Sequence, residues 1–271
     1  MGITSYQARK VAGISVRRVN QIWREYQITG ELPEIGLSNG RPIKLISDEE
    51  ISLVKEAFVM FNVSASSLEN IIKQRYNKHI PHNRIHKILL KEGFASRNDY
   101  KVIRKKKWIR YERRHSLTAV HIDWYYDPIK EQYVFAVIDD ASRKLLCLIE
   151  CDSASTENSI KGMEIALSQG HINQCISDHG SQFTSNERGE SKFKDFLESK
   201  GIRQILCRVK HPQSNGKVER FFGTYKSKRH FFATKEEFIH WYNEIRPHLS
   251  LNFDVLETPA QAFIRKMKAE N

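Results

Sequence analysis

Three acidic residues interrupt patterns that are otherwise apolar or helical. Asp123 breaks an apolar strand pattern, Asp178 directly follows another, and Glu219 lies in the first turns of an expected helix. The carboxyl ends of strands and the starts of helices are where sites form in sheet folds. The chain has 32 acidic residues, so position alone does not single these three out, and the segments around them, described below, decide the choice.

The chemistry that suits such a group is the breaking and joining of phosphodiesters. A phosphodiester is anionic, and so is an attacking hydroxide or 3′-hydroxyl. Two divalent ions about 3.5–4 Å apart activate the nucleophile and neutralise the leaving oxygen. Magnesium is a hard ion that prefers carboxylate oxygen, so neither His nor Cys ligands are needed.

Other reactive side chains are expected to have structural roles. Asp139 and Asp140 follow a strand, and aspartates in turns usually bond local backbone amides. The four cysteines form no CxxC pair and are expected to be reduced and mostly buried.

The elements that must position the acidic group alternate between strand and helix. The order predicts an α/β fold with a mixed sheet covered on both faces by helices. The expected strands are 119–125, 132–139, 144–150, 174–177 and 204–209, and the expected helices are 156–168, 191–200, 215–229 and a last pair from about 235.

Residues 4–26 predict two short helices around a turn. Thr4 or Ser5 can cap the first helix, Gly13 permits the turn, and Ser15 can cap the second. This is the pattern of a helix-turn-helix, whose second helix reads base edges in a major groove. A solvated helical hairpin is an equal alternative. The candidate DNA-reading residues are Arg17, Arg18, Gln21 and Arg24.

The next segment, 32–46, reads as a linker rich in glycine and proline. Its Gly-Arg-Pro sequence is extended and narrow, so Arg41 and nearby Lys44 could lie along a minor groove. A plain linker explains the same composition equally well.

Residues 47–93 predict a second helical module that also suits a helix-turn-helix. Ser47 and Glu50 form a capping-box pattern, and Arg84 is expected on the exposed side of the last helix as a DNA contact.

A basic connector follows over 94–115. It contains Lys105, Lys106 and Lys107 with interleaved aromatic residues, which suits contact with a nucleic-acid backbone. The whole chain carries 44 basic and 32 acidic side chains, a net charge of +12 that favours a polyanionic partner. No apolar run approaches a membrane span and no signal peptide is evident, so a cytoplasmic, nucleoid-associated protein without a membrane partner is expected.

Several short segments in order carry a resemblance to a known family. Residues from about 108 to 265 resemble the catalytic core shared by bacterial insertion-sequence transposases and retroviral integrases, the DDE family. The matching segments are HID (121–123), VIDDASR (137–143), SDHGSQF (177–183), HPQSNGKVERF (211–221), WYN (241–243), RPH (246–248) and TPA (258–260).

The resemblance implies an RNase H-like catalytic core preceded by all-α helix-turn-helix modules. In such a core Asp123 would bridge two Mg²⁺ or Mn²⁺ ions, with Asp178 and Glu219 completing the metal-binding and catalytic triad. The activity implied is nicking at the ends of a mobile element, followed by strand transfer. The partners implied are double-stranded DNA, as element ends and target, and further copies of the chain in dimers or larger assemblies.

The domain organisation expected on this basis has five parts. They are a helix-turn-helix module (1–31), a linker (32–46), a second helix-turn-helix module (47–93), a basic connector (94–115) and the catalytic core with its C-terminal helices (116–271).

The sequence departs from the usual family pattern in two places. Forty residues separate Asp178 from Glu219, more than in many relatives, and His179 stands where relatives often have asparagine. On the helix from 215 to 229, Lys226 shares the face of Glu219 and is expected to contact DNA near the metals. Lys217 lies off that line and is expected to touch flanking phosphates.

Two other functions are compatible with parts of the pattern. A catalytically silent, domesticated transposase could act as a DNA-binding regulator, and an RNase H-type nuclease would only hydrolyse. Three intact carboxylates disfavour the first alternative, and tandem DNA readers disfavour the second.

Overall fold

The computed structural model describes residues 2–31, 45–96, 112–184, 191–207 and 215–267. Contacts divide the chain into two compact units, residues 1–45 and residues 46–271. No single helix in the described ranges is long and apolar enough to cross a membrane, and one pair of helices, bent by 105°, passes that test only when taken together.

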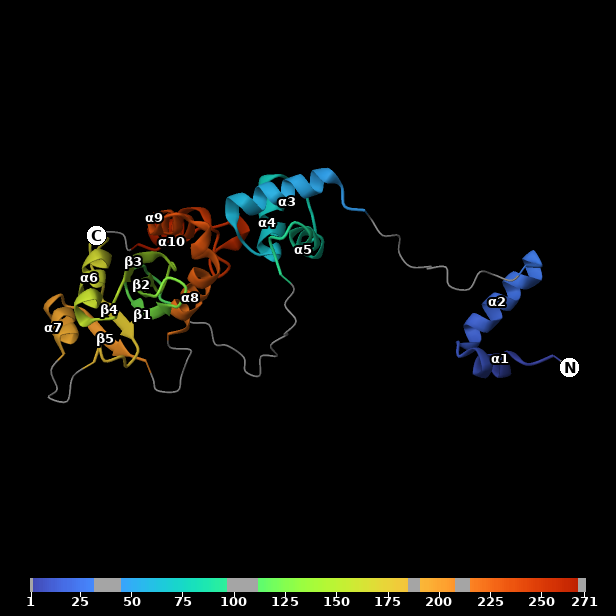
Figure 1. Cartoon of the computed structure of the whole chain (residues 1–271), viewed down its shortest axis with the longest axis horizontal. Helices are drawn as coiled ribbons and strands as arrows, with labels where there is room; N and C mark the ends of the chain where they lie inside the picture. The colour runs from blue at the N-terminus through green and yellow to red at the C-terminus, as the bar shows by residue number, and fades with distance from the viewer. Residues whose placement is uncertain (1, 32–44, 97–111, 185–190, 208–214, 268–271) are drawn as a thin grey trace. The chain divides into compact units, whose positions relative to one another are not determined.

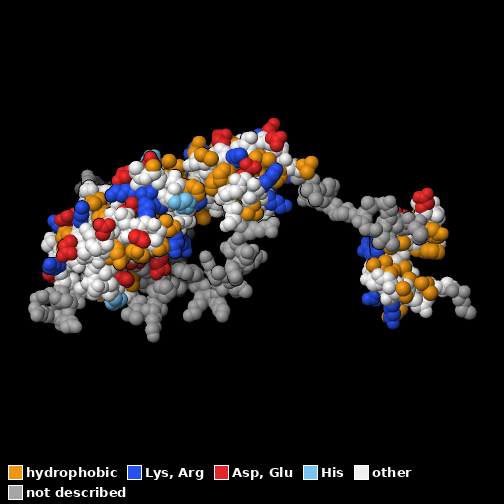
Figure 2. Space-filling view, in the orientation of Figure 1, with side chains coloured by type: hydrophobic (Ala, Val, Ile, Leu, Met, Phe, Trp, Pro, Cys, Tyr) orange, Lys and Arg blue, Asp and Glu red, His pale blue; other side chains and the backbone are white. Residues whose placement is uncertain are grey.

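The first unit is a helical hairpin of α1 (Ser5–Ala12) and α2 (Val16–Thr29). Thr4 caps α1 in a reciprocal capping box with Gln7, and the Ser15 side chain caps α2. Gly13 has φ of 66°, the left-handed conformation that glycine adopts without strain. The two predicted helices and their caps are confirmed. No residue of either helix is buried, and Figure 2 shows hydrophobic side chains at the surface of this unit.

A three-helix bundle begins the second unit. It consists of α3 (Asp48–Phe61), α4 (Ala65–Arg75) and α5 (His82–Lys91) (Figure 1). Ser47 and Glu50 form the predicted capping box at the start of α3. The bundle has its own apolar core, which includes Phe61, Leu68 and Ile85. This core extends to Ile245 and Leu256 of the C-terminal region, so the bundle packs against residues far along the chain.

A mixed five-stranded sheet forms the centre of the remaining chain. The order is β3-β2-β1-β4-β5, with antiparallel pairing among β1, β2 and β3 and parallel pairing of β4 with β1 and β5. The strands are β1 (Val120–Asp127), β2 (Gln132–Asp139), β3 (Leu145–Cys151), β4 (Gln174–Ser177) and β5 (Arg203–Leu206).

Helices cover both faces of the sheet (Figure 1). One core contains residues of α6, α7 and α10, and the other contains residues of α8, α9 and the π-helical turn that continues α9. The helices are α6 (Thr156–Leu167), α7 (Lys192–Ser199), α8 (Gly216–Lys228), α9 (Lys235–His240) and α10 (Pro259–Arg265), with the π turn η3 (Trp241–Ile245) and the 3-10 turns η2 (Arg229–Phe231) and η4 (Phe253–Val255). This is the predicted fold class, an RNase H-like core preceded by helices.

Alternation along the strands determines which side chains face α8. On β1, Val120 and Ile122 join the core beneath α6 and α7. Since successive side chains of a strand point to opposite faces, His121, Asp123 and Tyr125 point to the face that α8 covers. Tyr125 confirms this direction, because its ring packs against Phe222 of α8 at a centroid distance of 5.5 Å.

Candidate active site

Asp123 lies in the middle of β1, half-buried on the face covered by α8. Its Oδ1 accepts a hydrogen bond from the backbone N–H of Trp124 at 2.8 Å. Its Oδ2 accepts one from Asn215 Nδ2 at 3.1 Å. The two bonds orient the carboxylate, and neither partner is a cation.

Asp178 is the first residue after β4, the strand that runs parallel to β1. His121 pairs with Ile176 in this ladder, so the same register continued by two residues brings Asp178 alongside Asp123. Asp178 Oδ1 accepts a bond from the backbone N–H of Gly180 at 2.9 Å, which holds the following turn. The parallel strands thus bring together two of the three predicted acids.

Glu219 lies in the first turn of α8 and is exposed. Val218 and Phe222 anchor this part of the helix in the core formed with β2 and β3. The helix position therefore comes from apolar packing, whereas the Glu219 carboxylate stays accessible to solvent and to a ligand.

Electrostatic interactions show that the three acids are close to one another. Burial is the main cause that raises the pKa of Asp123, the negative charges of Asp178 and Glu219 add to it, and the resulting pKa is about 7. The thiol of Cys207, just after β5, has its pKa raised to about 11 by burial and then by the same three carboxylates. Asp123 thus experiences the charges of the other two acids, and the Cys207 thiol experiences the charges of all three. These acids are up to 96 positions apart in the sequence.

The three carboxylates are suitable ligands for divalent cations, but in this structure they are too far apart to hold one cation together. None of the three carboxylates forms an ion pair with Lys or Arg in the described ranges, and hard oxygen donors are what Mg²⁺ and Mn²⁺ prefer. As they stand, no three His, Cys, Asp or Glu side chains among the described residues are gathered closely enough to hold a metal ion.

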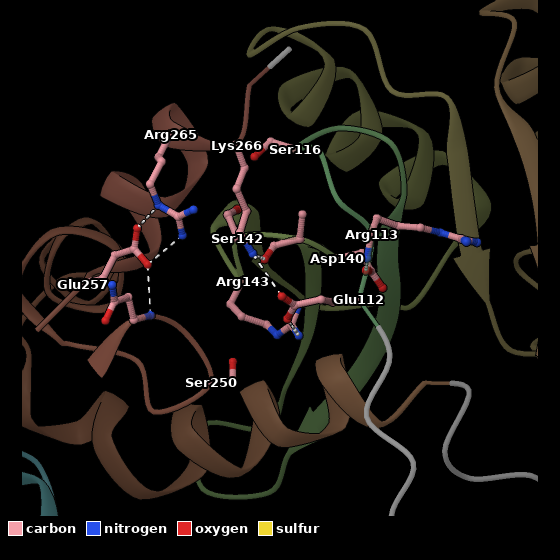
Figure 3. Close-up of polar contacts among 12 residues, drawn as sticks. Glu112, Arg113, Ser116, Asp140, Ser142, Arg143, Ser250, Glu257, Arg265 and Lys266 are labelled. Carbon is pink, nitrogen blue, oxygen red and sulfur yellow. Dashed lines mark hydrogen bonds and ion pairs between the residues drawn. The ribbon is translucent and has the colours of Figure 1, made fainter. Parts of the chain in front are cut away.

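Asp139 and Asp140, at the end of β2, accept bonds from backbone N–H groups, most of them distant in the sequence and not local as expected. Asp139 is buried and accepts bonds from the backbone N–H groups of Leu117 and Ser142, both at 2.8 Å. Asp140 accepts a bond from the backbone N–H of Arg113 at 2.6 Å. Figure 3 shows Asp140 beside Arg113 at this turn.

His179 ties together the segments that follow β4 and β5. Its Nε2 donates to the backbone carbonyl of Cys207 at 2.7 Å. The Cys207 backbone N–H in turn donates to Ser177 O at 2.8 Å. The histidine that stands where relatives often have asparagine thus makes a structural contact next to Asp178.

All four cysteines are free, with Cys147 and Cys175 buried and the other two half-buried.

The predicted DNA-reading residues of the first unit lie on α2. Arg17, Gln21 and Arg24 are exposed at helical spacing on one side, and Arg18 Nη1 donates to Gln21 Oε1 at 3.2 Å. Their role in DNA reading stays a prediction. Arg41, Lys44, Lys105, Lys106 and Lys107 lie outside the described residues.

The structure places Arg84 and Lys217 in ion pairs, whereas Arg84 was expected on the exposed side of its helix and Lys217 at flanking phosphates. Arg84 has a side chain only 16% exposed, and its Nε donates to Glu50 Oε2 at 2.8 Å. Lys217 is 15% exposed and contacts Asp140. Both partners are distant in the sequence, so no local pattern indicates these ion pairs.

Lys226, in contrast, is exposed and lies over Tyr125, on the face of β1 that carries Asp123. Its Nζ lies 5.6 Å from the centre of the Tyr125 ring, two residues along β1 from Asp123. This position suits the predicted contact with DNA near the acids.

The sequence prediction missed the polar residues that surround Asp123. Asn215 and His121 lie in the matching segments HPQSNGKVERF and HID, and no contact with Asp123 was predicted for either. In the structure both are buried, and a bond of 3.4 Å joins His121 Nδ1 to Asn215 Oδ1. A buried histidine next to an aspartate in an apolar strand was the available signal.

Comparisons with known proteins match the part of the chain that contains the three acids. Residues 113–212 match an integrase core domain family, and residues 200–253 match a second family with the same description. The first match contains Asp123 and Asp178, and the second contains Glu219.

One similar curated protein is "Putative integrase ORF3" of Spiroplasma virus SpV1-C74. It is 33% identical over 148 residues, which cover 46% of this chain and 40% of that protein. The chain therefore spans about two fifths of the length of this relative. Among solved structures, a chain of the simian T-cell lymphotropic virus intasome in complex with PP2A regulatory subunit B56 gamma matches at 15% identity and a TM-score of 0.48, covering 78% of this chain and 74% of that one.

Proposed function

Residues 113–253 of this chain belong to the family of retroviral integrases and DDE transposases, and on that premise we propose that the chain is a DNA-cutting and DNA-joining recombinase. The reaction proposed is hydrolytic nicking at the ends of a mobile element, followed by attack of the freed 3′-hydroxyl on target DNA.

The observation that carries this proposal is the electrostatic coupling of three carboxylates on three different elements. Asp123 on β1 experiences the charges of Asp178 and Glu219, and the pKa of its carboxyl is raised to about 7, first by burial and then by these charges. A purely structural role gives no reason to hold three acids together without cations. A phosphodiester reaction does, because divalent ions must be held there.

In this proposal Asp123, Asp178 and Glu219 would hold the Mg²⁺ or Mn²⁺ ions, with Asp123 as the shared ligand. Bound there, the ions would activate the attacking hydroxyl group and neutralise charge on the leaving oxygen. The chain supplies the orientation, because Trp124 and Asn215 each fix one oxygen of Asp123. Binding requires the carboxylates to approach one another more closely than in the structure described above.

The other residues of the chain would hold the DNA. Lys226 is exposed over Tyr125, on the face of β1 that carries Asp123, and is proposed to contact the DNA backbone there. The exposed side of α2 is proposed to read the element end. We further propose that two or more copies assemble on paired ends, in the cytoplasm at the nucleoid.

The test uses DNA that carries the inverted repeats flanking the gene. We expect nicking and joining with Mg²⁺ and neither with EDTA. Asp123→Asn should abolish both reactions and leave DNA binding within about two-fold, since the substitution removes one charge and keeps the shape. Cleavage that persists at the wild-type rate in this variant would overturn the assignment.

Asp127→Asn is the matched control. Asp127 lies on the same strand, but its carboxylate accepts bonds from the backbone N–H groups of Ile129 and Lys130 in the following turn. Its replacement should leave the cleavage rate intact after correction for folded protein. Nicking without joining would favour a nuclease, and binding without cleavage under any divalent ion would favour a silent regulator.

A further inference from the structure

The N-terminus of α8 lacks the usual side-chain cap, and its N-cap residue contacts Asp123 instead. Asn215 occupies the N-cap position, where an asparagine side chain normally accepts a bond from a backbone N–H of the first turn. It makes no such bond here. Its Nδ2 instead donates to Asp123 Oδ2 at 3.1 Å and lies 3.4 Å from Ile122 O. The Asn215 side chain therefore bonds the Asp123 carboxylate and does not cap the helix.

A buried histidine holds Asn215 in this orientation. His121 is 0% exposed, and its Nδ1 lies 3.4 Å from Asn215 Oδ1. On the other side of the ring, His121 Nε2 lies 2.8 Å from Asp140 Oδ1. The imidazole therefore links the amide that orients Asp123 to a buried carboxylate in the turn after β2.

Asp140 is in turn held by α8 itself. Lys217 Nζ lies 2.5 Å from Asp140 Oδ1 and 3.3 Å from the Asp140 backbone oxygen. The other carboxylate oxygen accepts the Arg113 backbone N–H at 2.6 Å (Figure 3). Burial alone would raise the pKa of Asp140, but the bond with His121 and the charge of Lys217 outweigh it and lower the pKa. Asp140 is thus ionised, and both of its carboxylate oxygens accept bonds from protein groups.

These four residues, His121, Asp140, Asn215 and Lys217, form one polar bridge between β1 and α8. The bridge holds β1 two residues before Asp123, and it holds α8 two residues before Glu219. A shift of α8 along β1 would break the bridge and change the distance between the two acids. A buried polar group without its partner destabilises the fold, so the polar bridge favours the one placement of α8 on β1 in which all of its bonds are made.

We propose that Asp140 and Lys217 are positioning residues, which act through His121 and Asn215 to fix Asp123 relative to Glu219 for divalent-cation binding. The inference rests on the proposed function for its biological purpose, but cation binding can be measured without DNA. Groups that orient metal ligands typically change metal affinity by about 10- to 100-fold when they are replaced.

The test is a titration of the full-length chain with Mn²⁺ alone, followed through the free-ion signal in electron paramagnetic resonance. Asp140→Asn and Lys217→Met should each raise the half-saturating Mn²⁺ concentration by about 10-fold or more. Lys217→Arg should restore most of the wild-type affinity, since it returns a cation to the same carboxylate. Asp123→Asn identifies the Mn²⁺ bound at the acidic group.

Asp139→Asn is the matched control, because Asp139 is equally buried in the same turn but bonds Leu117 and Ser142 instead of the polar bridge. It should lower stability to urea without changing Mn²⁺ affinity. Equal affinity shifts in Asp140→Asn and Asp139→Asn would overturn the inference, because turn stability would then explain both. If Asp140→Asn does not fold, Lys217→Met decides, since its side chain lies nearer the surface.

The two proposals can fail separately. Wild-type protein that binds Mn²⁺ at Asp123 but never nicks DNA would overturn the proposed function and leave the positioning result standing. Nicking that depends on Asp123, with Mn²⁺ affinity unchanged in Lys217→Met, would overturn the positioning role alone. Wild-type protein that binds no Mn²⁺ would overturn both.

Discussion

The indole Nε1 of Trp241 donates a hydrogen bond to the backbone carbonyl of Phe61, 2.9 Å away, although 180 positions separate the two residues. Phe61 is the last residue of α3, where helix carbonyls lack partners within the helix. Trp241 begins the π turn that follows α9. One bond therefore satisfies the end of a bundle helix and attaches the bundle to the core.

Replacing Trp241 with phenylalanine tests this attachment. The ring would still fill most of the buried space, but the carbonyl of Phe61 would lose its donor. We expect the free energy of unfolding to fall by about 1–3 kcal/mol. Hydrogen exchange should rise most at the C-terminal turn of α3. Wild-type exchange there would show that the bond contributes nothing to holding the bundle.

Two glycines in helices provide a matched pair of stability predictions. A Cβ at Gly162 of α6 would lie 2.5 Å from Phe135 Cε1, so Gly162→Ala must displace a buried ring of β2. Overpacking of this kind costs about 1–3 kcal/mol. Nothing lies within 4 Å of a Cβ at Gly223 of α8. Gly223→Ala should therefore stabilise the protein by up to about 1 kcal/mol through helix propensity.

Urea unfolding of both variants checks the pair. The two substitutions add the same methyl group to a helix, so any difference between them reports the surroundings. Changes of the same sign would contradict the close packing of α6 on the sheet.

The pH dependence of stability should include a contribution from Glu150 at the end of β3. Its Oε1 accepts bonds from Arg229 Nε at 2.8 Å and Tyr225 OH at 2.7 Å. Burial raises the pKa of Glu150, but these partners outweigh it, so the pKa lies below its ordinary value. Ionised Glu150 therefore stabilises the fold above the ordinary glutamate pKa of about 4.3, and this contribution is lost as the pH falls below that value.

Glu150→Gln should accordingly lower the free energy of unfolding by about 2–3 kcal/mol at pH 7, since it leaves Arg229 buried without its counter-charge. The gap between variant and wild type should narrow when urea unfolding is repeated between pH 5 and pH 3. A gap that stays constant over this range would mean that shape, and not charge, accounts for the loss.

The exposed side of α2 gives a prediction about DNA affinity. Arg17→Ala combined with Arg24→Ala should weaken binding of the full chain to element-end DNA. If both arginines contact phosphates, the slope of log affinity against log salt should fall by about two. If they read bases, the salt slope should stay and discrimination against altered end sequences should fall. Binding unchanged in strength, slope and discrimination would exclude α2 from the interface.

Much of the local structure could be predicted from the sequence because its causes are local. Ser15 and Ser47 cap helices through bonds that span three residues, and Gly13 takes the left-handed angle that ends α1. β2 and β4 were predicted to the residue, since their apolar runs end at residues that favour turns. The three acids were identified from the family-like segments around them, together with their positions within a strand, after a strand and at a helix start.

The contacts that orient those acids could not be predicted in this way. The bond between Asn215 and Asp123 joins positions 92 apart. Lys217 was expected at flanking phosphates, and its partner Asp140 lies 77 positions away. Such bonds depend on how α8 packs against β1. The sequence pattern specifies that a helix covers the sheet but not its exact placement along a strand.

The hairpin of α1 and α2 contains 8 and 14 helical residues, none of them buried. Isolated helices shorter than about 12–15 residues are marginal in water, because closing the first turn costs more entropy than one bond returns. A surface that covers Tyr6, Trp23 and Ile28, each more than half exposed, would supply the missing apolar contact. Association through this hairpin should then show the large negative heat-capacity change of folding coupled to recognition.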